Sequence, residues 1–143
     1  MMNLESYEFY LEFKVRDYEC DMDGVVNNAQ YLHYLEHTRN VCMKSKGLTY
    51  REMTLKKDHI FIVKVSMEFK LPLGPDDEFV VALSVERSSN AKMTIYQDIY
   101  RLTDQKLILK AEIVALGVTA NGSYRLPQTV IDAFPLVRVN MQN

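Results

Sequence analysis

One helix-period segment followed by almost unbroken strand patterning restricts the fold of this chain more than any other feature. From Asn28 to about Lys46, apolar side chains recur at the spacing of a helix, which predicts one long amphipathic helix. Gly47 is suited to end it, and Thr49 followed by Glu52 resembles a capping box that predicts a short second helix over Tyr50–Lys56. The predicted buried stripe of the long helix is Tyr31, Leu32, Leu35, Thr38, Val41 and Cys42.

Strands are predicted on both sides of the long helix, because apolar and polar residues alternate there. The first strand begins at Phe9 and runs directly into Asp21. Asn121-Gly122 predicts a type I′ hairpin turn, followed by a short strand to Leu126 and a helical turn around 129–134. The other predicted strands are 63–71, 79–85, 92–102 and 106–119. In the first of these, the residues expected to face the core are Val63, Val65, Met67, Phe69 and Leu71.

This order of elements predicts an α+β fold, in which a curved antiparallel β-sheet wraps around a long central α-helix. The reason is that the apolar stripe of the helix must be buried, and the sheet is the only surface large enough to bury it. With 143 residues, of which 48% are hydrophobic, the chain can form a sizeable core as a single domain spanning 1–143. The edge strands of such a sheet are unpaired in a monomer, which favours dimerisation edge to edge.

Composition excludes several classes of partner. A formal net charge of −2 and a pI near 5.9 give no general attraction to nucleic acid or to an anionic membrane. We find no apolar run of membrane-spanning length and no signal-peptide pattern. Two cysteines, Cys20 and Cys42, are too few for a disulfide scaffold. These features predict a cytoplasmic protein without nucleic-acid or membrane partners.

The run from Val15 to Tyr31, followed by Glu36 and Arg39, resembles the signature of hotdog-fold thioesterases of the 4-hydroxybenzoyl-CoA thioesterase superfamily. Its Val-Arg-Asp-Tyr opening and its Gly-Val-Val-Asn-Asn-Ala stretch are especially similar to acyl-acyl carrier protein thioesterases of the acyl-lipid and methylketone-synthase kind. The resemblance covers 9–134. It implies hydrolysis of acyl-CoA or acyl-acyl carrier protein thioesters by a homodimer that assembles into a tetramer, without a metal or other cofactor.

The resemblance also implies the catalytic groups. The catalytic aspartate of the family falls on Asp21, which either attacks the thioester carbonyl or activates a water as general base. The backbone N–H that polarises the carbonyl falls on Asn28, where the positive end of the helix adds to its effect. Many relatives carry histidine at the position of Val25 or Asn28, and this chain has none there. Asp23 adds a second carboxylate, which would raise the pKa of Asp21 if both were buried.

Substrate-binding residues are expected along the same helix and on the central strands. An acyl slot and the thioester carbonyl would be lined by Val26, Asn27, Tyr31, Leu35 and Val63. Arg87 and Lys92 lie where relatives often place basic residues for the phosphate of CoA or of a carrier protein. The side chains of Asn27 and Asn28 are also suited to cap the helix.

The same residues also match other motifs. The stretch 19–24 mimics the start of a calcium loop, but Gln30 stands where such a loop requires a bidentate glutamate. The sequence His33-Tyr34-Leu35-Glu36-His37 matches an inverted zinc-protease pattern, yet it lies on the polar face of the helix, which favours a solvated surface. Glu36 and Arg39 are spaced for a structural ion pair. At the level of function, the alternative is a non-catalytic acyl-thioester binding module. A dehydratase is disfavoured, because its usual histidine has no counterpart here.

Overall fold

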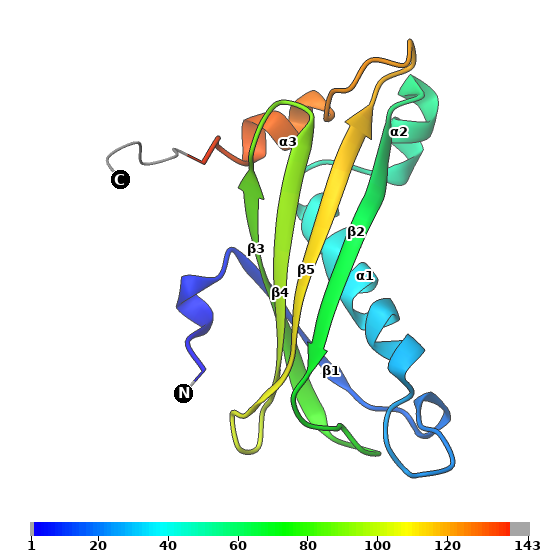
Figure 1. The fold of residues 1–143 in the computed structure, drawn as a ribbon, viewed down its shortest axis with the longest axis vertical. Helices are drawn as coiled ribbons and strands as arrows, with labels where there is room; N and C mark the ends of the chain where they lie inside the picture. The colour runs from blue at the N-terminus through cyan, green and yellow to red at the C-terminus, as the bar shows by residue number, and fades with distance from the viewer. Residues whose placement is uncertain (1, 138–143) are drawn as a thin grey trace.

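The computed structural model describes residues 2–137 and contains one long helix lying against a five-stranded antiparallel sheet (Figure 1). The predicted α+β class is confirmed. The strands are β1 (Phe9–Lys14), β2 (His59–Phe69), β3 (Glu78–Arg87), β4 (Lys92–Arg101) and β5 (Leu107–Val118). The helices are α1 (Asn28–Ser45), α2 (Tyr50–Lys56) and α3 (Gln128–Ala133), and short 3-10 turns occupy η1 (Leu4–Ser6) and η2 (Asp17–Glu19). The spatial order β1-β3-β4-β5-β2 makes β1 and β2 the two edges.

The core lies between α1 and the face of the sheet that it covers. Alternate residues of β3, β4 and β5 point into this layer, because side chains on a strand alternate between its two faces. One buried polar residue joins the two layers: Gln97 on β4 donates from Nε2 to the carbonyl oxygen of Leu35 on α1, at 3.0 Å. The largest core side chains include Leu35, Phe79, Leu83, Ile95, Ile99, Leu109 and Ile113.

The boundaries of the two predicted helices are confirmed to within a residue. α1 begins at Asn28 and α2 spans Tyr50–Lys56, with the Thr49 side chain accepting from the Glu52 N–H at 3.1 Å. One face assignment was wrong. Leu32 is 41% exposed, whereas Tyr34 is 4% exposed and belongs to the core. The sheet therefore contacts a stripe of α1 rotated away from Leu32.

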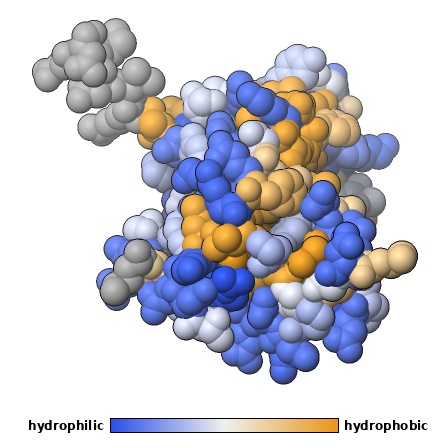
Figure 2. Space-filling view, turned by 60° about the horizontal axis from the view of Figure 1, so that its bottom comes forward, coloured by the Kyte–Doolittle hydropathy of each residue, from blue (hydrophilic) through white to orange (hydrophobic). Residues whose placement is uncertain are grey.

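β2 departs most from its predicted burial. It was expected to bury alternate residues, but Ile60 and Met67 are only partly buried and the other large apolar side chains of the strand are exposed. The reason is its position, since an edge strand has a neighbour on one side only, here β5. A register shift between Ile62 and Lys64 also displaces Val63 from the regular pairing. Hydrophobic side chains reach the surface in patches among hydrophilic ones (Figure 2). In and after β2 the exposed ones are Phe61, Ile62, Val63, Val65, Phe69 and Leu71.

Three local predictions also need correction. β1 ends at Lys14 and does not continue to Asp21. The Asn121-Gly122 turn is not type I′, because only Gly122 has a positive φ, of +85°. The strand expected after this turn is reduced to a bridge between Val118 and Tyr124. The predicted C-terminal helical turn is confirmed as α3. Within the described chain, no helix has the length and apolar character to cross a membrane.

Candidate active site

The connection between β1 and α1 folds into a small hairpin that carries Asp21 at its turn. Cys20 and Val26 form an antiparallel bridge, and the Asp21 N–H donates to the Val25 carbonyl at 2.9 Å. The chain reverses at Asp21 to Gly24, where the Gly24 N–H donates to the Asp21 carbonyl at 3.1 Å. Gly24 has a φ of +77°, which a residue with a side chain adopts only with strain. Asp21 therefore lies in a tight, hydrogen-bonded turn.

The Asp21 carboxylate is exposed and uses one of its oxygens locally. Its Oδ1 accepts from the Asp23 N–H at 2.9 Å, which is the pattern of an Asx turn. No hydrogen bond from a residue within 2–137 reaches its Oδ2. Asp23 is exposed as well, so the burial needed for strong repulsion between the two carboxylates does not occur. One oxygen fixes the orientation of the group, and the other is free to act on a substrate.

The first turn of α1 presents a free backbone donor. Asn27 caps the helix, and its Oδ1 accepts from the Ala29 N–H at 2.9 Å. The Gln30 N–H donates to the Asn27 carbonyl, also at 2.9 Å. In the part of the chain that the structure describes, no acceptor is bonded to the Asn28 N–H. An unpaired N–H at the positive end of an 18-residue helix is suited to bind a developing oxyanion.

Glu19 holds this connection against α1, and the sequence analysis did not identify it as part of the site. The side chain is 7% exposed and accepts three hydrogen bonds. Its donors are the Arg16 N–H at 2.8 Å, the Gln30 Nε2 at 2.9 Å and the Tyr34 Oη at 2.9 Å. The Glu19 carbonyl also accepts from the Asn27 N–H at 3.0 Å. Burial raises the pKa of Tyr34, and its hydrogen bond to Glu19 raises it further, so the phenol stays protonated as a donor.

The hairpin is fixed on its other side by the segment that precedes β3. The Val26 N–H donates to the Leu73 carbonyl at 2.8 Å, and the Leu73 N–H donates to the Tyr31 Oη at 3.2 Å. Val26, Tyr31 and Leu73 are all buried. The turn that carries Asp21 is therefore attached both to α1 and to the segment between β2 and β3, which places a carboxylate and a free helix N–H in one connection.

The structure brings some of the predicted substrate-binding residues together and separates others. Val26, Asn27 and Tyr31 lie within or beside the connection, but Asn27 caps the helix and the other two pack in the core. Leu35 lies on the face of α1 that packs against the sheet and is fully buried. Val63 is 57% exposed at the irregularity of the edge strand. These residues do not line a common slot within one chain.

The structure contradicts the prediction that Arg87 binds a phosphate. Its side chain is buried, because it faces the helix side of the sheet and holds the segment after α3. Its Nε donates to the Phe134 carbonyl at 2.7 Å, and its Nη1 donates to the Ser89 carbonyl at 2.8 Å and to Asn90 Oδ1 at 2.9 Å. This guanidinium has a structural role and does not face a phosphate. Lys92 is exposed, but it begins β4 beside the end of β3 that lies farther from the Asp21 turn, and the ten residues of β3 span about 30 Å.

The remaining polar residues of α1 are placed as follows. His33 and His37 are exposed, and the His37 ring packs edge-on against Phe13 with 5.9 Å between centroids. The expected ion pair of Glu36 with Arg39 is replaced by a hydrogen bond from Arg39 Nη1 to Gln97 Oε1 at 2.9 Å. Burial lowers the pKa of Arg39.

A curved antiparallel sheet around one long helix, with a carboxylate turn at the start of that helix, defines the hotdog class of fold. The 1,4-dihydroxy-2-naphthoyl-CoA thioesterase of Synechocystis has the same fold, with a TM-score of 0.82 over 87% of this chain and 93% of that one at 20% identity. Residues 15–135 match the Thioesterase-like superfamily, and the chain belongs to this family.

Two curated relatives come from Arabidopsis thaliana, and both are named chloroplastic acyl-acyl carrier protein thioesterases. ATL3 is 35% identical over 89% of this chain and 68% of its own length. ATL2 is 36% identical over 80% of this chain and 60% of its own length. The chain thus spans about two thirds of these relatives.

Proposed function

We propose that this chain hydrolyses acyl thioesters of CoA or of acyl carrier protein to the free acid and thiol. One observation carries the proposal: the connection from β1 to α1 presents a carboxylate oxygen of Asp21 and the unpaired N–H of Asn28. Asp21 acts as nucleophile or as general base toward water, and both roles fit an exposed, oriented carboxylate. The Asn28 N–H stabilises the oxyanion, and one such donor is typically worth roughly 3 to 4 kcal/mol.

Membership of the Thioesterase-like superfamily supports this reaction class, and the names of the Arabidopsis relatives support a carrier-protein substrate. Both cysteines are free, which fits a reducing compartment such as the cytoplasm. The isolated protein should release free thiol from a panel of acyl-CoA and acyl-carrier-protein thioesters, measured with a thiol-reactive dye. If no member of the panel is hydrolysed, the proposal fails. Tight binding of an intact thioester without release would instead favour a binding module.

The same proposal includes a homodimer joined through β2. Six large apolar side chains in and just after this edge strand are exposed, and the outer backbone groups of an edge strand are unpaired. A second copy related by a two-fold axis would cover the apolar side chains and pair the backbone groups, because its own β2 can extend the sheet antiparallel to the first. Assembly of such dimers into a tetramer belongs to the proposal as well.

Placing a charge on this edge should separate the dimer. In Val65→Glu, two like charges meet near the two-fold axis inside an apolar contact, so we expect a monomer in sedimentation equilibrium where the parent protein is a dimer. Leu55→Glu is the matched control, because Leu55 is an exposed aliphatic residue on α2 and not part of β2. A Val65→Glu protein that remains dimeric would show that β2 is not the interface.

A further inference from the structure

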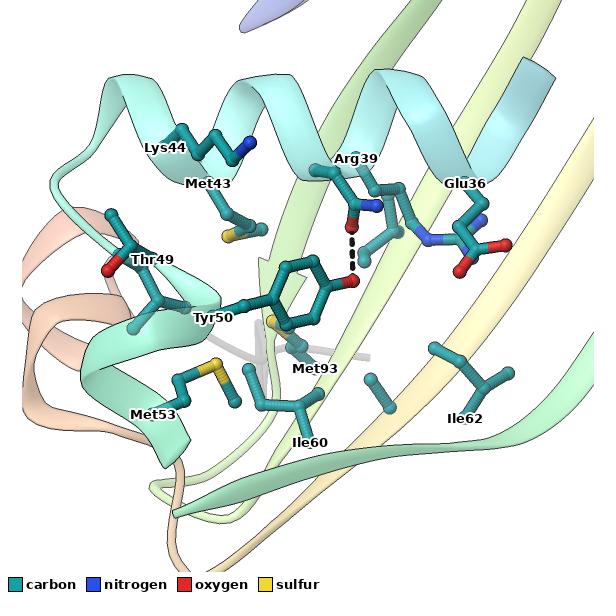
Figure 3. A pocket seen from close by; sticks show the side chains of 14 residues that line it. Glu36, Arg39, Met43, Lys44, Thr49, Tyr50, Met53, Ile60, Ile62 and Met93 are labelled. Atoms are coloured by element: carbon teal, nitrogen blue, oxygen red, sulfur yellow. Dashed lines mark hydrogen bonds between the residues drawn. The ribbon is translucent and has the colours of Figure 1, made fainter. Parts of the chain in front are cut away.

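A cavity lies between α1, α2 and the helix-facing side of β2, β4 and β5 (Figure 3). Its volume is about 190 Å³. The floor is apolar and comes from five elements or connections of the chain, while the rim is polar. Floor residues are Met43, Leu48, Met53, Ile60, Met93 and Ile95. Three of these are methionines, whose flexible side chains adapt to an irregular apolar ligand.

A tyrosine from α2 crosses the outer side of the cavity. The Tyr50 Oη donates to Asn40 Oδ1 on α1 at 2.7 Å, and the ring lies between the two helices (Figure 3). Met53, one turn further along α2, points into the same space (Figure 3). α2 thus closes the end of the cavity that lies toward the C-terminus of α1. It does so with the exposed Tyr50 and with Met53, which is partly buried at the margin of the core.

The cavity is aligned with the candidate active site along one stripe of α1. Asn28, Leu32 and Glu36 follow each other at four-residue spacing, so their side chains lie on the same side of the helix. Glu36 lines the near end of the cavity, eight residues and about 12 Å of helix from Asn28. Met43 lies fifteen residues along, at about 22 Å. The exposed Leu32 is then an apolar surface between the free N–H and the cavity.

We propose that this cavity is a slot for the distal part of an unbranched acyl chain, and that Tyr50 and Met53 of α2 set the longest chain accepted. This rests on the proposed thioesterase function. A thioester held at Asn28 extends its acyl chain over Leu32, so a short acyl group ends before the cavity and a longer one enters it. Each methylene buried there is worth about fourfold in binding. The substrate class is therefore long-chain acyl thioesters, because an extended chain needs roughly ten carbons to cover the distance from Asn28 to the near end of the cavity.

The slot is tested by filling its end. In Met53→Trp the larger ring occupies the space of the acyl terminus at the far end of the cavity, so kcat/KM for hexadecanoyl-CoA should fall about tenfold or more relative to butyryl-CoA. Butyryl-CoA hydrolysis should stay at the parent level, because that chain does not reach the cavity. Leu55→Trp is the matched control, since Leu55 lies on the same helix, is 75% exposed and does not line the cavity. It should keep the parent chain-length profile.

A second variant tests the same slot by opening it. Tyr50→Ala removes the ring and its hydrogen bond to Asn40, so the optimum should move toward chains longer than hexadecanoyl, with eicosanoyl-CoA gaining relative to hexadecanoyl-CoA. An unchanged profile in both Tyr50→Ala and Met53→Trp would overturn the proposal.

Binding of hexadecanoate, followed by calorimetry, reports on the slot even if no thioester is hydrolysed. We expect Met53→Trp to weaken this binding by about tenfold and Leu55→Trp to leave it unchanged. Equal hexadecanoate affinity in Met53→Trp and the parent protein would refute the slot. Absence of hydrolysis with a Met53-dependent hexadecanoate affinity would refute the thioesterase reaction alone.

Discussion

Replacing Asp21 by asparagine should lower kcat for every thioester by about a thousandfold, within the range that a positioned general base or nucleophile contributes. The amide oxygen of asparagine can still accept from the Asp23 N–H, so the turn and its geometry are kept. What is lost is the charged, basic oxygen that attacks the carbonyl or takes the proton of water. The measurement is single-substrate kinetics of thiol release at saturating substrate, together with thermal unfolding to establish that the fold is unchanged.

Asp23→Asn is the matched control for this result. Asp23 is a second exposed carboxylate of the same turn, and its backbone N–H, which supports Asp21, is present in the variant. We expect kcat of Asp23→Asn to remain close to that of the parent protein. Equal losses in the two variants would indicate that the turn needs its overall negative charge, and full activity of Asp21→Asn would remove Asp21 from the mechanism.

Most of the fold could be predicted because its determinants are local. The helical period of 28–46 and the strand patterns of 79–85 and 92–102 can be read from neighbouring residues alone, and the structure confirms each of these elements. The start of α2 follows from the Thr49 cap, which needs only residues close in sequence. The overall architecture then follows, since one apolar helix and one sheet have few ways to bury each other.

The errors arise where burial depends on distant neighbours. Apolar and polar residues do alternate in β2, but alternation does not indicate whether a strand lies at the centre or at the edge of a sheet. The edge position of β2 leaves Val65 exposed. The choice between Leu32 and Tyr34 as core residues depends on how α1 is rotated on the sheet. The Asn121-Gly122 turn has the composition of type I′, yet only its glycine adopts the required φ.

In the candidate site, too, residues of a local motif were predicted and residues with distant partners were not. Asp21 and Asn28 were identified because they belong to one continuous motif, and the geometry around them supports the proposed chemistry. Arg87 was misassigned because its partner, the Phe134 carbonyl, lies 47 residues away. Glu19 was overlooked for a similar reason, since its contacts with Gln30 and Tyr34 come from the next helix. Its spacing from Arg16, three residues as in a helix cap, was the only local signal.

Glu19→Ala should destabilise the protein by about 3 kcal/mol and also lower kcat. The substitution leaves three donors without their acceptor, of which the buried Tyr34 hydroxyl is the most costly because water reaches it least. Arg16 and Gln30 are less buried than Tyr34, so water can replace the carboxylate as their acceptor more easily. Since the Asn27 N–H is bonded to the Glu19 main chain, loosening this residue also shifts the start of α1 and the oxyanion donor at Asn28.

Tyr34→Phe separates the two effects. It removes a single hydrogen bond, so urea unfolding should show a loss of about 1 kcal/mol, while the two other bonds to Glu19 keep the connection in place and kcat stays near the parent value. A Glu19→Ala protein that equals Tyr34→Phe in both stability and kcat would mean that water replaces the carboxylate. In that case the rigidity of the Asp21 turn would come from the hydrogen bonds within the hairpin and from the bond between Val26 and Leu73, because the substitution leaves these in place.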